Sequence, residues 1–93
     1  MPMNGLQWGL VVTSNAAITS FFAARNKTTS ENWDDYVTWA TANSKIIPDD
    51  TDFCTWLNTP DTDVVPANFI EFSLAVSEWM FYLYNESIIA ASA

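Results

Sequence analysis

Three carboxylates, Asp49, Asp50 and Asp52, form the densest cluster of ionisable side chains in the sequence. Paired carboxylates can serve as general acid and base, and closely spaced aspartates can hold calcium. The run from Asp50 begins like a calcium loop, but Thr55 stands at the sixth position, where such loops need glycine. The twelfth position is Asp61 instead of glutamate. The spacing therefore favours capping of a helix N-terminus over catalysis or calcium binding.

Other catalytic and metal chemistry lacks the residue types that it needs. The chain has no histidine and one cysteine, Cys54, which excludes a Cys–His nucleophile, a zinc site and an internal disulfide. Gly5 and Gly9 are too few for a glycine-rich phosphate loop. Cys54 lies in an apolar run and is expected to be a buried thiol. The sequence predicts a protein that is not an enzyme and uses neither metal nor cofactor.

Charge is sparse and unevenly distributed along the chain. Eleven acidic and three basic residues give a formal charge of −8, and only 15% of residues are charged. The bases lie between residues 25 and 45, whereas residues 46–93 carry eight acids and no base. Such a surface repels nucleic acid and attracts basic surfaces. The expected partner is a protein with a basic surface, with no direct binding of nucleic acid.

Capping patterns and apolar spacing divide the chain into helices. Residues 16–24 should form a helix capped by Ser14 or Asn15, and residues 30–44 a helix with a Thr28–Glu31 capping box. Residues 49–58 should form a short third helix. Residues 6–12 alternate in hydropathy as a strand does, but the same residues also fit a helix. We expect a single, mainly helical domain over residues 1–93: a compact bundle of three to four helices, with a short extended N-terminal segment as an option.

The last predicted helix, residues 66–90, is unusual because all its charged residues lie within one arc about 100° wide, while Ser73, Ser77 and Tyr84 lie between its two apolar flanks. This arc contains Glu71, Glu78 and Glu86, and most other positions are apolar. Surface helices normally show the inverse pattern, with a narrow apolar stripe. The helix is therefore expected to be the central one of the domain, or to offer a second apolar flank to a partner.

Aromatic residues are more numerous than a small interior can easily hold. The chain has five Trp, six Phe and three Tyr, and each ring could bury about 150–250 Å². A domain of this size buries only about 60–65% of the surface of its unfolded chain. Two or three rings are thus expected on the surface as anchors for a partner, with Trp56 and Trp79 as candidates. The uncharged residues 1–24 include several polar side chains, so no membrane span is expected.

In size and composition the chain resembles the phage anti-CRISPR and anti-restriction proteins as a class. The resemblance implies a viral inhibitor, cytoplasmic in the host cell, that blocks a nucleic-acid-handling complex, with nucleic-acid mimicry as one route. An acidic face can occupy a basic channel and repel its proper ligand. The expected partner contacts are the acids of the C-terminal half and two tryptophans: Asp49, Asp50, Asp52, Asp61, Asp63, Glu71, Glu78, Glu86, Trp56 and Trp79.

The alternative is a small virion structural or assembly protein. In this case the apolar C-terminal helix packs against copies of itself or against a larger partner, as in large hydrophobic interfaces. A symmetric oligomer would favour the alternative, whereas a monomer that binds a basic partner would favour the inhibitor. A small antitoxin-like or regulatory subunit is a third option.

Overall fold

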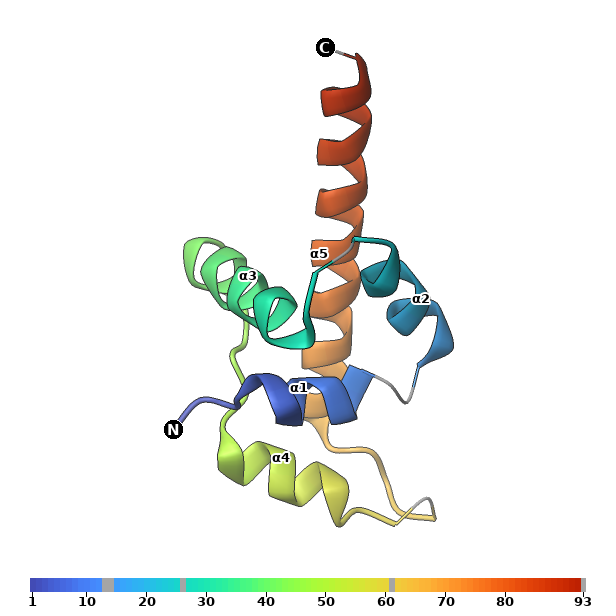
Figure 1. Ribbon diagram of the computed structural model, residues 1–93. Coiled ribbons are helices and arrows are strands. Elements are labelled where there is room, and N and C mark those ends of the chain that lie inside the picture. The colour runs from blue at the N-terminus through green and yellow to red at the C-terminus, as the bar shows by residue number, and fades with distance from the viewer. Residues whose placement is uncertain (13–14, 26, 61, 93) are drawn as a thin grey trace.

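The chain forms five α-helices, as seen in a computed structural model that describes residues 1–12, 15–25, 27–60 and 62–92 (Figure 1). The helices are α1 (Gly5–Val12), α2 (Ala16–Ala24), α3 (Thr29–Ala42), α4 (Asp50–Leu57) and α5 (Ala67–Ser92). Within these ranges there is no strand, only an isolated bridge between Pro2 and Asp49. The predicted helical class is confirmed, but the predicted count of three to four helices is too low.

The additional helix is α1, in the segment that the sequence left open between strand and helix. Asn4 and Gln7 cap it reciprocally: the Gln7 N–H donates to Asn4 Oδ1 (2.9 Å), and the Asn4 N–H donates to Gln7 Oε1 (3.0 Å). These bonds satisfy N–H groups that have no partner within the helix. The residues before α1 are extended and form backbone hydrogen bonds with the segment before α4. There the Met3 N–H donates to the Pro48 carbonyl (3.0 Å).

The helices α2 and α3 begin where their capping residues predict. The Asn15 side chain accepts hydrogen bonds from the backbone N–H groups of Ala17 and Ile18. Thr28 and Glu31 form the expected capping box of α3. Ser14, the other candidate cap for α2, lies outside the described residues.

An aromatic cluster around Trp8 joins α1, α2, α3 and α5. Trp8 is 1% exposed, and its ring centroid lies 5.3–6.1 Å from those of Phe22, Trp33, Tyr36, Phe72 and Trp79. Aromatic pairs at these separations stabilise a core beyond the area that they bury. Tyr36 is fully buried, and its hydroxyl donates to the Ile46 carbonyl (2.7 Å).

The two tryptophans expected on the surface are instead in the core. Trp79 is 1% exposed and Trp56 is 9% exposed. The Trp56 indole N–H donates to Asn68 Oδ1 (3.0 Å), and its ring stacks on that of Phe72. A partner cannot contact either ring unless the core opens. Three aromatic side chains of the described chain are exposed, namely Phe81, Tyr82 and Tyr84.

Cys54 is exposed on α4, contrary to the expectation of a buried thiol. The inward side of this short helix is occupied by Phe53 and Trp56, which are both buried. At 100° per residue, Cys54 points well away from the direction of these two rings. The apolar run around Cys54 is therefore divided between a buried and an exposed side.

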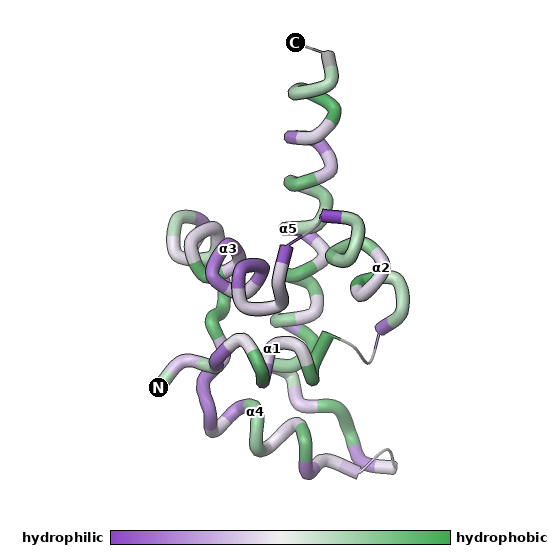
Figure 2. Tube along the Cα trace, in the orientation of Figure 1, coloured by the Kyte–Doolittle hydropathy of each residue, from purple (hydrophilic) through white to green (hydrophobic). Residues whose placement is uncertain are grey.

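The helix α5 is the longest element, and its C-terminal half projects beyond the other helices (Figure 1). Its 26 residues span about 39 Å, within a molecule that measures 47 × 26 × 21 Å. Residues 84–91 are all exposed. Figure 2 shows apolar positions continuing along this projecting half. No helix of the described ranges has the length and hydropathy needed to cross a membrane.

Candidate protein-interaction surface

The side of α5 that faces away from the core carries an apolar stripe, called here the outer seam. It consists of Ile70, Leu74, Ser77, Phe81, Tyr84, Ile88 and Ala91. Successive members are alternately four and three residues apart, which is the spacing of the contact positions in a coiled coil. The five large side chains are 45–67% exposed. Side chains at this spacing lie in one row along the helix.

The outer seam lies roughly opposite the part of α5 that is packed into the core. Phe72, Val76 and Trp79 are each at most 2% exposed. At 100° per residue, their mean direction is about 145° away from that of the outer seam. α5 is therefore packed into the core, as one of the two sequence alternatives expects, and it also carries a second, exposed apolar side; the partner expected on that side stays a prediction.

The acids of α5 lie between its two apolar sides. Glu78 forms an ion pair with Lys45 (2.7 Å). Glu86 interacts with Tyr82, and its negative charge raises the pKa of the Tyr82 hydroxyl. Glu71 is exposed. None of these three positions belongs to the outer seam, so the exposed stripe is uncharged from residue 70 to residue 91.

A groove of about 570 Å³ lies between α3 and α5, where α5 leaves the body of the protein. Its apolar wall includes Trp39, Tyr82 and Leu83. The rings of Trp39 and Tyr82 are 6.4 Å apart. Arg25 and Asp35 also line the groove. The groove contains charged side chains, in contrast to the uncharged outer seam.

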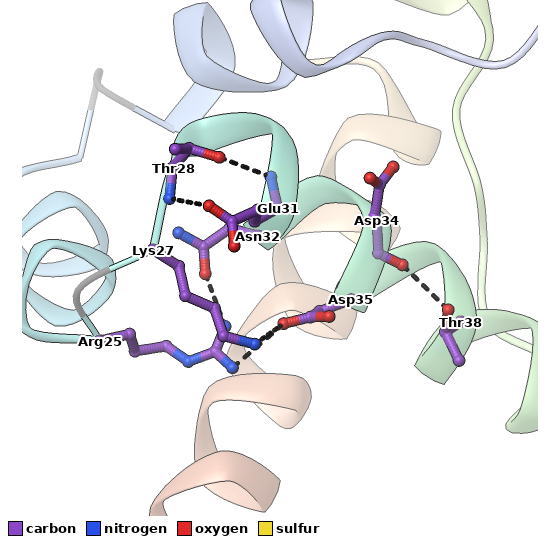
Figure 3. A network of polar contacts seen from close by, with 8 residues as sticks. All are labelled: Arg25, Lys27, Thr28, Glu31, Asn32, Asp34, Asp35 and Thr38. Atoms are coloured by element: carbon purple, nitrogen blue, oxygen red, sulfur yellow. Dashed lines mark hydrogen bonds and ion pairs between the residues drawn. The ribbon is translucent and has the colours of Figure 1, made fainter.

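The charged side chains of this groove belong to a network that holds α2 and α3 together (Figure 3). Arg25 donates to Asn32 Oδ1 (2.5 Å) and to Asp35 Oδ2 (3.3 Å), and Lys27 donates to the same Asp35 oxygen (2.7 Å). The hydrogen bond from Lys27, together with Arg25, lowers the pKa of the Asp35 carboxyl. Each of the four side chains in this network has a hydrogen-bond partner within it, so we assign the network to folding.

Asp49 and Asp52 are used as helix caps, as the sequence predicts. The Asp52 N–H donates to Asp49 Oδ1 (2.8 Å), and the Asp49 N–H donates to Asp52 Oδ2 (3.1 Å). The backbone hydrogen bond from Asp52 lowers the pKa of the Asp49 carboxyl. Asp52 also accepts from Asn68 Nδ2 (2.6 Å). Two members of the predicted acidic contact surface are therefore committed to holding α4 in place.

The remaining acids do not gather on one face. Asp50 and Asp63 are exposed near α4, and Asp61 lies outside the described residues. Glu71 and Glu86 are separated by about 22 Å along α5. Figure 1 places α4 and the C-terminal end of α5 at opposite ends of the molecule. The predicted acidic contact residues are thus spread over the length of the protein.

No three His, Cys, Asp or Glu side chains within the described ranges are grouped so that they could hold a metal ion. No protein-family model, curated protein or solved structure matches this chain. Its function is therefore inferred from the chemistry of its surface, where the outer seam is the most extensive feature. Sequence reasoning missed Phe81, Tyr84 and Ile88 as candidate contact residues, although their spacing of three and four residues is visible in the sequence.

Proposed function

We propose that this chain is a non-enzymatic assembly or adaptor protein that binds a further protein chain, of the same or a different sequence, through the outer seam of α5. The observation that carries the proposal is the exposure of five large apolar side chains in one row. The same chain buries four of its five tryptophans. The exposure of the five side chains on α5 is therefore not the result of a poorly formed core. Contiguous apolar surface on a folded domain is typical of protein interfaces.

The projecting half of α5 supports the same proposal on energetic grounds. Helices in proteins are stabilised mostly by packing an apolar side against other elements, and isolated helical segments of this length are marginal in water. Residues 84–91 are exposed on all sides and include Tyr84, Ile88 and Ile89. A partner packed on this segment would add tertiary contacts to apolar side chains that are exposed in the single chain.

Charge distribution favours a second candidate, the viral inhibitor that occupies a basic channel. In the described chain all three bases form ion pairs with the chain's own acids, Asp35 and Glu78. The exposed acids Asp50, Asp63 and Glu71 have no such basic neighbour among the described residues. They would be available to a basic partner, and binding through them would weaken as salt rises.

One capture experiment separates the two candidates. The wild-type chain, a seam variant (Phe81→Gln with Tyr84→Gln) and a charge variant (Asp50→Asn with Asp63→Asn) are used as baits at low and high salt. For the assembly protein we expect capture of a specific partner that survives high salt and is lost only in the seam variant. Loss of capture in the charge variant alone, or loss of capture by the wild-type chain at high salt, would favour the inhibitor over the assembly protein. Capture that is unchanged by either variant would contradict both.

A further inference from the structure

The outer seam has the length, the residue spacing and the uncharged contact positions of one helix of a coiled coil. It runs from Ile70 to Ala91, or about 32 Å of helix. Its central members, Phe81 and Tyr84, are 67% and 56% exposed. On this basis, and resting on the proposed function, we infer that the occupant of the outer seam is a second copy of this chain, packed seam to seam along α5.

The exposed area is sufficient for a dimer of this kind. From their exposed fractions, the five large side chains of the outer seam present about 500 Å² of apolar surface per chain. Two copies would therefore bury about 1,000 Å² before the flanking residues are counted, which is the lower bound for a specific interface. A two-fold contact also needs the same patch on both partners, and one helical row satisfies this requirement by itself.

Charge favours a second copy over a basic partner at this position. Glu71 is the exposed acid beside the N-terminal end of the outer seam. Farther along, Glu78 is already paired with Lys45 and Glu86 lies on the far side of α5, so the acids along most of the outer seam are not available to select a basic partner. On the other border of the outer seam, Ser73, Met80 and Ser87 are uncharged. An uncharged apolar row is best matched by another uncharged apolar row, and this chain supplies one of equal length.

The arrangement of the body leaves room for this contact. The core contacts of α5, made by Phe72, Val76 and Trp79, are on the side opposite the outer seam. In a seam-to-seam pair the two bodies would therefore lie on the two outer sides of the helix pair. The body flanks the N-terminal half of the outer seam, where Leu74 and Ser77 each line a hollow with residues of other elements, whereas residues 84–91 are all exposed.

The test is the sedimentation equilibrium of the full chain at several concentrations and two salt levels. We expect a monomer–dimer equilibrium in which the dimer strengthens as salt rises, because each copy carries a formal charge of −8 and screening reduces the repulsion between copies. A basic partner would show the opposite dependence on salt.

Two tyrosines on α5 provide a matched pair of variants. Tyr84 is on the outer seam, whereas Tyr82, which is 45% exposed, points towards the α3 groove. Tyr84→Gln should weaken dimerisation about tenfold or more, and Tyr82→Gln should change it by less than about twofold. Circular dichroism of both variants confirms that α5 remains helical.

Three outcomes would overturn the self-pairing: a monomer at all concentrations and both salt levels, a dimer that dissociates as salt rises, or equal effects of the two tyrosine variants. The proposed function fails separately, in the capture experiment with the seam variant. A monomer that still captures a different protein through Phe81 and Tyr84 would leave the assembly function standing and remove only the second copy as occupant.

Discussion

The guanidinium carbon of Arg25 lies 5.5 Å from the centre of the Trp79 ring. The same guanidinium donates to Asn32, which is 3% exposed. One charged side chain therefore connects the end of α2, the first turns of α3 and the middle of α5. Lys27 reaches the same partner, Asp35, but from a more exposed position.

Arg25→Ala is expected to lower the free energy of unfolding by about 2 kcal/mol, because it leaves a buried amide oxygen without a donor and removes the contact with Trp79. Lys27→Ala is the control, since it removes an exposed ion pair to the same carboxylate and should change stability by about 0.5 kcal/mol or less. Urea denaturation followed by tryptophan fluorescence measures both. Equal losses for the two variants would contradict the structural role given to Arg25.

Gly5 sits where α1 approaches α3 closely. A Cβ atom at this position would lie 2.8 Å from the Cα of Ser30, a backbone atom that cannot move aside easily. Gly5→Ala should therefore destabilise the protein by about 1–3 kcal/mol, despite the higher helix propensity of alanine.

Gly9 provides the control for this close approach. A Cβ on Gly9 would meet the Thr29 Cγ2 methyl at 2.8 Å, and Thr29→Ser removes that methyl. Gly9→Ala in the Thr29→Ser background should thus be neutral or stabilising in thermal unfolding. If the Gly5→Ala variant were as stable as the wild-type chain, α1 and α3 would have to be farther apart than the structure shows.

Asp49→Ala should destabilise α4 by about 1 kcal/mol, because Asp49 accepts the hydrogen bond of the Asp52 N–H as an N-cap. Asp50→Ala is the matched control with the same change in charge and should remain within about 0.5 kcal/mol. Chemical denaturation of the two variants distinguishes capping from general charge. It also follows that tests of acidic contacts should substitute Asp50 and Asp63, which are exposed, and leave the capping pair intact.

Stability should depend on pH in a defined window. Hydrogen bonds lower the pKa values of the Asp35, Asp49 and Glu31 carboxyls below their ordinary values. A group with a lowered folded pKa contributes stability above its unfolded value, near pH 4, and this contribution is lost as the pH falls through the folded value. The chain has no histidine, so side-chain titration should leave stability nearly constant from about pH 5 to pH 8.

Asp35→Asn is the variant that tests this window. Urea midpoints measured between pH 2 and pH 7 should fall less steeply below pH 4 in Asp35→Asn than in the wild-type chain.

Burial raises the pKa of the Tyr36 hydroxyl, so a second loss of stability is expected at alkaline pH, above the ordinary tyrosine value of about 10. A transition near pH 6.5 would contradict these assignments.

Local signals in the sequence were sufficient to place most helices. The capping residues Asn15, Thr28 and Asp49 mark helix starts that the structure reproduces. The alternating run at residues 6–12 was ambiguous because its exposed leucines, Leu6 and Leu10, are as apolar as its buried residues. The two buried residues of this run, Trp8 and Val12, are four residues apart, which is the spacing of a helix.

The identity of the exposed rings could not be predicted from the sequence. Trp79 and Phe81 are two residues apart on a helix with two apolar sides, and hydropathy does not distinguish these sides. Which side is covered depends on where α1, α2 and α3 dock, and that is a property of the whole fold. Tryptophan was predicted at the surface because it is enriched in interface anchors, but here its large ring fills the core.

The shape of the single chain has a consequence for the rotational diffusion of the monomer. Because α5 runs along the longest dimension of a 47 × 26 × 21 Å body, its backbone N–H bonds are aligned with the long axis and are reoriented only by end-over-end tumbling. The N–H bonds of α1 and α4, which cross that direction (Figure 1), are also reoriented by the faster spinning about the long axis. In ¹⁵N relaxation measurements by nuclear magnetic resonance, the apparent correlation time of an amide should therefore depend on the direction of its helix. The longest apparent correlation times are expected in α5.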